Sequence, residues 1–221
     1  MILKKFTDRA EAGRTLATLL TSYTGTKSVV YALPRGGAIV GKEIATALNL
    51  PLDLIITRKV SHPDNPEYAL ASVTEGGEVL CNAKEPSSVS ESWFDEEVVK
   101  QQSEARRRRK SYLGERTRVS AKGKNAIIVD DGVATGLSIF LAIKEIKNDI
   151  PWKTIVAVPV ISADVAQEMK GEVDEFFAII IDENYAGSVG SYYENFSEVT
   201  DEDVIDSLRD FFPPEQETIS L

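Results

Sequence analysis

One stretch decides the fold of this chain: Asn125-Ala126-Ile127-Ile128-Val129-Asp130-Asp131-Gly132-Val133-Ala134-Thr135-Gly136-Leu137-Ser138. Its apolar part, Ala126 to Val129, predicts a strand buried in a parallel sheet. Ligands of open α/β sheets bind just past the carboxyl ends of such strands, which is where Asp130 and Asp131 follow. We therefore expect an α/β fold with a ligand site at this strand end.

The loop after the two acids suits a single phosphate group. It consists mostly of small or hydroxyl-bearing residues, namely Gly132, Val133, Ala134, Thr135, Gly136, Leu137 and Ser138. Successive backbone N–H groups of such a loop close around an anion at the N-terminus of the following helix. Ionised aspartates accept hydrogen bonds, so the two acids suit neighbouring ribose hydroxyls. The stretch predicts a sugar-phosphate site.

Three other phosphate chemistries fit the stretch less well. A nucleoside-triphosphate loop needs a lysine after its second glycine, where this chain has Leu137. A dinucleotide fingerprint needs three glycines in a fixed spacing that Gly132 and Gly136 do not provide. An aspartyl-phosphate mechanism gives the Thr-Gly loop no role. An ordinary strand-to-helix turn with acids near a helix start stays open as the non-functional alternative.

Residues Ile127 to Gly136 resemble the phosphoribosyl pyrophosphate (PRPP) motif of type I phosphoribosyltransferases. The end departs from the pattern, because Ser138 stands where many members carry threonine, but the hydroxyl is kept. The resemblance implies a Rossmann-like parallel sheet flanked by helices, with a mobile loop over the site and a small hood that selects the nucleobase. It covers roughly residues 8–206, and Glu67-Tyr68-Ala69 and the stretches 192–196 and 200–204 are similar to a bacterial subfamily of phosphoribosyltransferases.

A second anion-binding motif is Tyr31-Ala32-Leu33-Pro34-Arg35-Gly36-Gly37-Ala38, again at a strand end. Gly36 and Gly37 let backbone N–H groups face a ligand closely, and the forked guanidinium of Arg35 grips phosphate oxygens. The motif resembles the loop that holds pyrophosphate in type I phosphoribosyltransferases. Some members of that family have a non-proline cis peptide in this loop. A tight turn beside a solvated arginine is the alternative interpretation.

Arg58 and Lys59 follow the next strand and resemble the family's basic contact to pyrophosphate. Solvation of a strand end is the alternative for both. We expect an insertion of about residues 58–115 to act as the mobile loop, excluding water from an easily hydrolysed donor. Within it the sequence predicts a loop over Ser61 to Pro66, a hairpin of Tyr68 to Thr74 and Glu78 to Asn82, a linker from Pro86 to Ser90, and a helix from Ser92 to Tyr112.

The rest of the chain alternates helices and strands, which favours a parallel sheet covered on both faces. We expect helices over residues 8–22, 38–48 and 163–169, and strands over residues 28–33, 52–57, 154–160 and 175–181. The chain is expected to form a single domain over residues 1–221, with a core of about 8–182 and a tail of about 183–221. The aromatic tail residues Tyr185, Tyr192, Tyr193 and Phe196 suit either base stacking or docking contacts.

Composition sets further limits. A formal net charge of -10 over 221 residues argues against general nucleic-acid binding. The run Arg106 to Lys110 suits RNA or pyrophosphate contacts, but a solvated helix partnered by Asp95, Glu96, Glu97 and Glu104 is the simpler interpretation. The chain shows no secretory signal or membrane span, so we expect a cytoplasmic protein. A single cysteine and a single histidine leave no basis for a disulfide or a zinc site.

The resemblance implies an enzyme that transfers the phosphoribosyl group of PRPP to a nitrogenous base or related amine and releases pyrophosphate. Asp130, Asp131 and Lys59 are the expected catalytic residues. Mg²⁺ is the expected cofactor, held by Asp130 and Asp131, directly or through water, together with substrate phosphates. A PRPP- or nucleotide-sensing regulator and a hydrolase of phosphoribosyl compounds remain alternatives. The acceptor and the role of Glu67 stay open, and a homodimer is plausible because family members often pair.

Overall fold

The computed structural model describes residues 5–82 and 89–212, except for the side chains of Pro66 and Glu67. Its core is a five-stranded parallel sheet in the order β2-β1-β6-β7-β8. These strands are β1 (Ser28–Ala32), β2 (Leu52–Leu54), β6 (Asn125–Val129), β7 (Lys153–Ser162) and β8 (Glu175–Asp182). The predicted Rossmann-like α/β fold is confirmed, and every residue of β1 and β2 is buried, as expected for strands covered on both faces.

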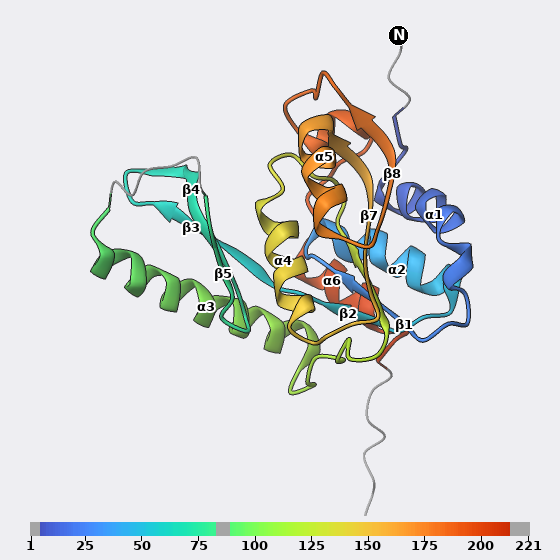
Figure 1. Ribbon diagram of the computed structural model, residues 1–221, viewed down its shortest axis with the longest axis horizontal. Coiled ribbons are helices and arrows are strands. Elements are labelled where there is room, and N and C mark those ends of the chain that lie inside the picture. The colour runs from blue at the N-terminus through green and yellow to red at the C-terminus, as the bar shows by residue number, and fades with distance from the viewer. Residues whose placement is uncertain (1–4, 83–88, 213–221) are drawn as a thin grey trace, which may run out of the picture.

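Alternate residues of the strands supply two hydrophobic layers. Val30 and Ile127 pack in one cluster with α1 (Arg9–Leu19), α2 (Gly36–Leu48) and α6 (Asp201–Leu208). Tyr31 and Ile128, one residue further along, pack in the other cluster with α4 (Leu137–Lys147) and α5 (Ala163–Glu172). Figure 1 shows α1 and α2 on one side of the sheet and α4 and α5 on the other. The two layers follow from the period-two alternation of side chains along a strand.

The connections reverse direction between β1 and β6. From β1 the chain passes through α2 to β2 on one side of the sheet, while β6 pairs with the other edge of β1. Such a reversal opens a crevice at the carboxyl ends of the two central strands, where α/β proteins bind ligands. The two motifs of the sequence, after Ala32 and after Val129, therefore emerge side by side at the reversal.

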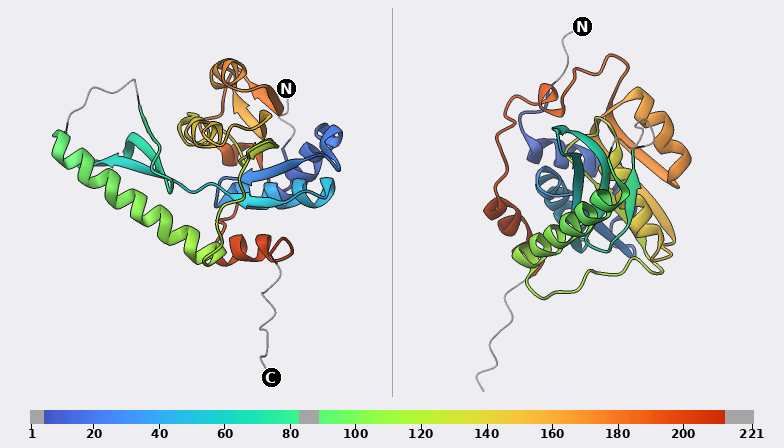
Figure 2. Two further views of the ribbon diagram at one scale, coloured as in Figure 1. Left: turned by 60° about the horizontal axis from the view of Figure 1, so that its bottom comes forward. Right: turned by 90° about the vertical axis from the view of Figure 1, so that its left-hand side faces the viewer.

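A second, antiparallel sheet and a long helix form an arm that extends from the core. The sheet contains β3 (Thr57–His62), β4 (Asn65–Thr74) and β5 (Val79–Cys81), and the helix is α3 (Glu91–Leu113). Figures 1 and 2 show this arm projecting from one side of the parallel sheet. The predicted hairpin and the predicted long helix are both present, although the linker over residues 86–90 lies mostly outside the described residues.

Two of the predicted elements differ most from the structure. The strand predicted over residues 52–57 divides, because β2 ends at Leu54 and the chain leaves the parallel sheet to start β3 at Thr57. The loop predicted over residues 61–66 is wrong, since β3 and β4 continue to a short turn at Pro63 and Asp64. A register shift between β3 and β4 leaves residues 66–68 without a partner on β3. The missing backbone N–H of Pro66 therefore costs no hydrogen bond to β3.

The tail contains regular structure that the sequence analysis does not assign. A short 3-10 helix, η2 (Val189–Tyr192), precedes α6. Thr200 and Asp203 form a capping box at the start of α6, and Val204 and Leu208 are buried against the core. No helix among residues 5–82 and 89–212 has the length and apolar character needed to cross a bilayer.

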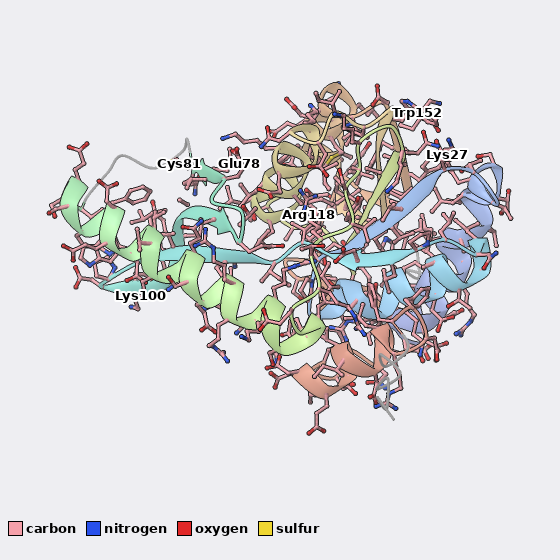
Figure 3. The ribbon with its side chains drawn as sticks, turned by 90° about the horizontal axis from the view of Figure 1, so that it is seen from below. Lys27, Glu78, Cys81, Lys100, Arg118 and Trp152 are labelled. Carbon is pink, nitrogen blue, oxygen red and sulfur yellow. The ribbon has the colours of Figure 1, made fainter. Side chains whose placement is uncertain are left out.

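Buried charges join the arm to the core. Arg109 of α3 contacts Asp53 of β2 at 3.0 Å and Glu75 of the hairpin turn at 3.4 Å. Arg118 contacts Asp149 at 3.0 Å and lies at the junction of arm and core in Figure 3. Because a buried carboxylate such as Asp53 needs a partner, its contact with Arg109 helps to fix how the arm leaves the sheet.

These buried charges make stability depend on pH through Glu75. Burial raises the pKa of Glu75 from 4.5 to about 7, although Arg109 opposes this rise. A carboxyl with a raised pKa in the folded protein stabilises the fold fully below about pH 4.5, and this contribution is lost as the pH rises through about 7. We predict that Glu75→Gln removes this pH dependence. The unfolding free energy of the variant minus that of wild type should therefore increase by up to about 3 kcal/mol when the pH is raised from 4.5 to 8. Urea unfolding at the two pH values measures this difference, and a difference that is constant with pH would contradict the prediction.

Candidate functional site

The two acids of the main motif lie at the carboxyl end of β6. The carboxylate of Asp130 accepts a hydrogen bond from the backbone N–H of Asp131 at 2.8 Å. The Asp131 carboxylate is only 16% exposed and contacts Arg9 Nε at 2.6 Å. The acids thus form one compact group, with Arg9 of α1 as the basic partner.

Burial controls the protonation of this pair. Burial raises the pKa of Asp130 well above its usual range, and the neighbouring charge of Asp131 raises it further. Burial also raises the pKa of Asp131, while the hydrogen bond and charge of Arg9 oppose the rise. Perturbed carboxyl groups of this kind are typical of functional sites.

Tyr193 connects the tail to the main motif. Its hydroxyl donates a hydrogen bond to the backbone carbonyl of Asp131 at 2.6 Å, and the residue is buried. Burial, followed by the charge of Asp131, raises the pKa of this hydroxyl above its usual range, so the hydroxyl keeps its proton and remains a donor. The tail therefore reaches the acids directly, and Tyr193 serves here as a packing and donor residue.

The loop after the acids is tethered to the end of β7. Val133 pairs with Ile161 through a backbone bridge, and Ser162 Oγ donates to the carbonyl of Ala134 at 3.3 Å. Gly136, the residue just before α4, has a left-handed conformation with φ of 80°, which favours glycine. Among the described residues, no side chain caps the amides at the start of α4. These amides carry the partial positive charge of a helix N-terminus and suit an anion.

A cavity of about 500 Å³ lies between this loop and the arm. Ala134, Thr135, Leu137 and Ser138 line one wall, whereas Gly132, Val133 and Gly136 contribute to the loop without lining the cavity. The arm lines another wall with Lys59, Tyr68, Cys81 and Asn82, and Asp164 and Glu168 of α5 also face the space. The loop is therefore accessible to a small molecule.

The second motif lies directly against the first. A methyl group added at Gly36 would lie 1.8 Å from Asp131 Oδ2, and one added at Gly37 would lie 3.0 Å from the Asp130 Cα. The Pro34–Arg35 peptide bond is cis. The two glycines are required because the backbone of one loop touches the acids of the other.

Arg35 has an internal partner in the tail. Its Nη2 contacts Glu198 Oε1 at 2.6 Å, and the two side chains are 37% and 76% exposed. The carboxylate of Glu198 thus binds the guanidinium group that we expect, from the sequence, to contact pyrophosphate. An incoming anion has to compete with this carboxylate for Arg35.

Arg58 and Lys59 point to opposite faces of β3, as neighbours on a strand do. Lys59 faces the cavity beside the loop of residues 134–138. Arg58 Nε donates to Gln101 of α3 at 3.1 Å, and burial lowers its pKa. The structure therefore brings Lys59, but not Arg58, to the cavity, and a contact of either residue with pyrophosphate stays a prediction.

The basic run on α3 contacts the protein itself. Arg107 and Arg108 pair with Glu104, one of the partners expected from the sequence. The other members contact groups around them: Arg106 the carbonyl of Glu75, Arg109 the carboxylate of Asp53, and Lys110 the carboxylate of Glu115. The run thus supports the helix and the arm junction.

Three residues at the site are absent from the sequence expectation in these roles: Arg9 beside Asp131, Tyr193 on its carbonyl, and Glu198 on Arg35. Arg9 carried one sequence signal, since a cation in the first turn of a helix opposes the helix dipole. Tyr193 is one of the aromatic tail residues that the sequence offers for base stacking or docking contacts, but its bond to Asp131 depends on how the tail folds back over the core. Glu198 carried no sequence signal, for the same reason. The role of Glu67 lies outside the described side chains.

Comparisons with known proteins give the relatives of this chain. The family profile described as "Phosphoribosyl transferase domain" matches residues 5–194. "Putative phosphoribosyl transferase Rv0571c" of Mycobacterium tuberculosis strain H37Rv is 34% identical over 215 residues, 95% of this chain and 48% of that protein. The chain thus spans about half the length of this relative. The crystal structure of TT1426 from Thermus thermophilus has a TM-score of 0.78 and 38% identity, covering 94% of this chain and 99% of that one.

The Arg35 contact generates a prediction. Glu198→Gln removes the competing carboxylate, so we expect the affinity for inorganic pyrophosphate to rise up to about fivefold, the worth of an exposed ion pair. Asp206→Asn, which removes the partner of Arg209 elsewhere in the tail, is the matched control and should leave the affinity unchanged. Calorimetric titration measures both variants, and unchanged or weaker binding by Glu198→Gln would show that Glu198 does not compete.

Proposed function

The chain belongs to the phosphoribosyl transferase domain family, and from this we propose that it transfers the 5-phosphoribosyl group of PRPP to a nitrogenous base or related amine, releasing pyrophosphate. The contact between the two motifs supports the proposal most strongly. Gly36 packs against Asp131, so a ligand bound at the reversal between β1 and β6 meets the acids and the Arg35 loop together. A sugar that carries phosphates at both ends matches this arrangement.

The loop of residues 134–138 is our proposed site for the 5′-phosphate. Its amides lack a side-chain cap within the described part of the chain and line an accessible cavity. The phosphate gains both hydrogen bonds and the favourable end of the α4 dipole. Lys59 adds a positive charge from the arm.

Asp130 and Asp131 are proposed to bind the ribose hydroxyls and to stabilise the reacting sugar. Departure of pyrophosphate from C1 makes the sugar ring cationic. One carboxylate about 5 Å from this charge contributes on the order of 3 kcal/mol at an effective dielectric constant near 20, roughly a hundredfold in rate. Arg35 and the amides of Gly36 and Gly37 would receive the negative charge of the leaving group.

Mg²⁺ fits the donor set of this site. Asp130 and Asp131 provide the oxygen ligands that it prefers, directly or through water. Within residues 5–82 and 89–212 no group of three or more His, Cys, Asp or Glu side chains suits a metal by itself, so the substrate would supply further oxygens. When bound, the ion would neutralise charge on the pyrophosphate.

A two-stage assay tests the function. Calorimetry with PRPP and Mg²⁺ measures binding, and a pyrophosphate-release assay then screens purines, pyrimidines and other amines. We expect binding, and release that requires one class of acceptor. Binding without release by any acceptor favours a sensor, release without an acceptor favours a hydrolase, and absence of binding would refute the proposal.

The double variant Asp130→Asn, Asp131→Asn is the negative control for this assay. Both amides keep the shape of the acids but cannot ionise, so pyrophosphate release should disappear. The fold should persist, because asparagine matches aspartate in size and polarity, and thermal unfolding of the variant checks this. Wild-type turnover by this variant would remove the acids from the mechanism.

Lys59 offers a further prediction. Because a charge-assisted hydrogen bond is worth about 1.5 to 3 kcal/mol, Lys59→Ala should weaken PRPP binding by about 10- to 100-fold. Lys100→Ala is the control, since Lys100 is 72% exposed and lies on α3, away from the strand that carries Cys81 in Figure 3. Calorimetry compares the two, and an equal effect of both substitutions would contradict a specific role for Lys59.

A further inference from the structure

Arg9 is a buried charge at an unfavourable place in a helix. It is the first residue of α1, where a cation opposes the helix dipole, and its side chain is 11% exposed. Helix stability therefore does not account for an arginine here. A buried guanidinium needs partners that offset its desolvation.

The partners of Arg9 all belong to the site. Its Nε contacts Asp131 Oδ2 at 2.6 Å, and its Nη1 donates to the carbonyl of Ser197 at 2.9 Å. Its guanidinium carbon lies 3.7 Å from the centre of the Phe196 ring. A methyl group at Gly36 would lie 2.9 Å from its Nε. One side chain thus touches the acid, the Arg35 loop and the tail.

Attachment of α1 to the core does not depend on Arg9. Ala12 and Leu16 are fully buried, and Gly13 allows α1 to approach α2 so closely that an added methyl group would lie 2.8 Å from Glu43 Cβ. These contacts hold the helix by packing. The contact between Arg9 and Asp131 is therefore not needed to attach α1 to the core, and we look for its role at the carboxylate of Asp131.

We propose that Arg9 is a positioning residue for the transfer reaction, an inference that rests on the proposed function. By holding Oδ2 of Asp131, Arg9 fixes the carboxylate so that Oδ1 is presented to a ribose hydroxyl. The same contact offsets the charge of Asp131 beside Asp130, which allows two acids to lie together at one strand end. The stack on Phe196 and the bond to Ser197 lock the guanidinium in this orientation.

A double-mutant cycle tests the proposal, with PRPP binding in the presence of Mg²⁺ measured by calorimetry. Arg9→Gln should weaken binding by about tenfold or more, as expected for loss of a charge-assisted contact. In an Asp131→Asn background the same change should have almost no effect, because no carboxylate remains to be oriented. Arg9→Lys keeps the charge without the fork and should recover part of the affinity.

Arg14→Gln is the matched control on the same helix. Arg14 is 58% exposed and pairs with Glu43 at 3.4 Å, so its loss should leave PRPP binding unchanged. Thermal unfolding of each variant identifies any that fail to fold, and Arg9→Lys then carries the comparison. Where an acceptor has been found, Arg9→Gln should lower kcat as well as raise KM, a change that a purely structural contact would not produce.

The outcomes separate this inference from the proposed function. Binding of PRPP by wild type together with unchanged or tighter binding by Arg9→Gln overturns the role of Arg9 and leaves the transferase proposal standing. Additive effects of the Arg9 and Asp131 substitutions also overturn it. Absence of PRPP binding by wild type overturns the proposed function and this inference with it.

Discussion

The close contact between two loops at the carboxyl ends of β1 and β6 is the constraint on which the rest of the site depends. Gly36 has no room for a side chain because the carboxylate of Asp131 occupies the space. The contact exists because the strand connections reverse between β1 and β6, which brings two distant segments of the chain to one crevice. It joins an acid pair suited to a sugar with a glycine loop suited to an anion, and it keeps both at fixed separation on rigid strands.

The arm and the tail both contribute residues to the site. The arm brings Lys59 to the cavity beside the 134–138 loop, and buried charges around Arg109 help to fix its attachment to the sheet. The tail brings Tyr193 to the main motif and Glu198 to Arg35. Both elements thus place polar groups on a scaffold that the parallel sheet holds rigid. Under the proposed function, pyrophosphate would displace Glu198 from the exposed Arg35 contact, whereas the buried contacts of Arg9 and Tyr193 would remain as fixed support.

The sequence predicted the parallel sheet, the acids and the loops because these features are local. An apolar run, a pair of aspartates and a glycine-containing loop can each be recognised from a few consecutive residues, as in Val129 to Gly136. The division of the strand at Leu54 was not predictable in this way, because it depends on where the arm leaves the sheet. Thr200 and Asp203 have the spacing of a capping box in the sequence, but this pattern alone did not lead us to expect a helix there. The Arg9 and Glu198 contacts bridge more than a hundred residues of sequence, and no local pattern specifies such partners.

We propose that main-chain amides of the 134–138 loop bind a phosphate while the adjacent acids bind its sugar. Amide proton and nitrogen chemical shifts during titration with ribose 5-phosphate test it most directly. We expect the largest downfield amide shifts on residues 134–138, with smaller changes at Asp130 and Asp131. The shifts at 134–138 should persist in the Asp130→Asn, Asp131→Asn variant. Saturable binding that leaves the amides of residues 134–138 unshifted would contradict it.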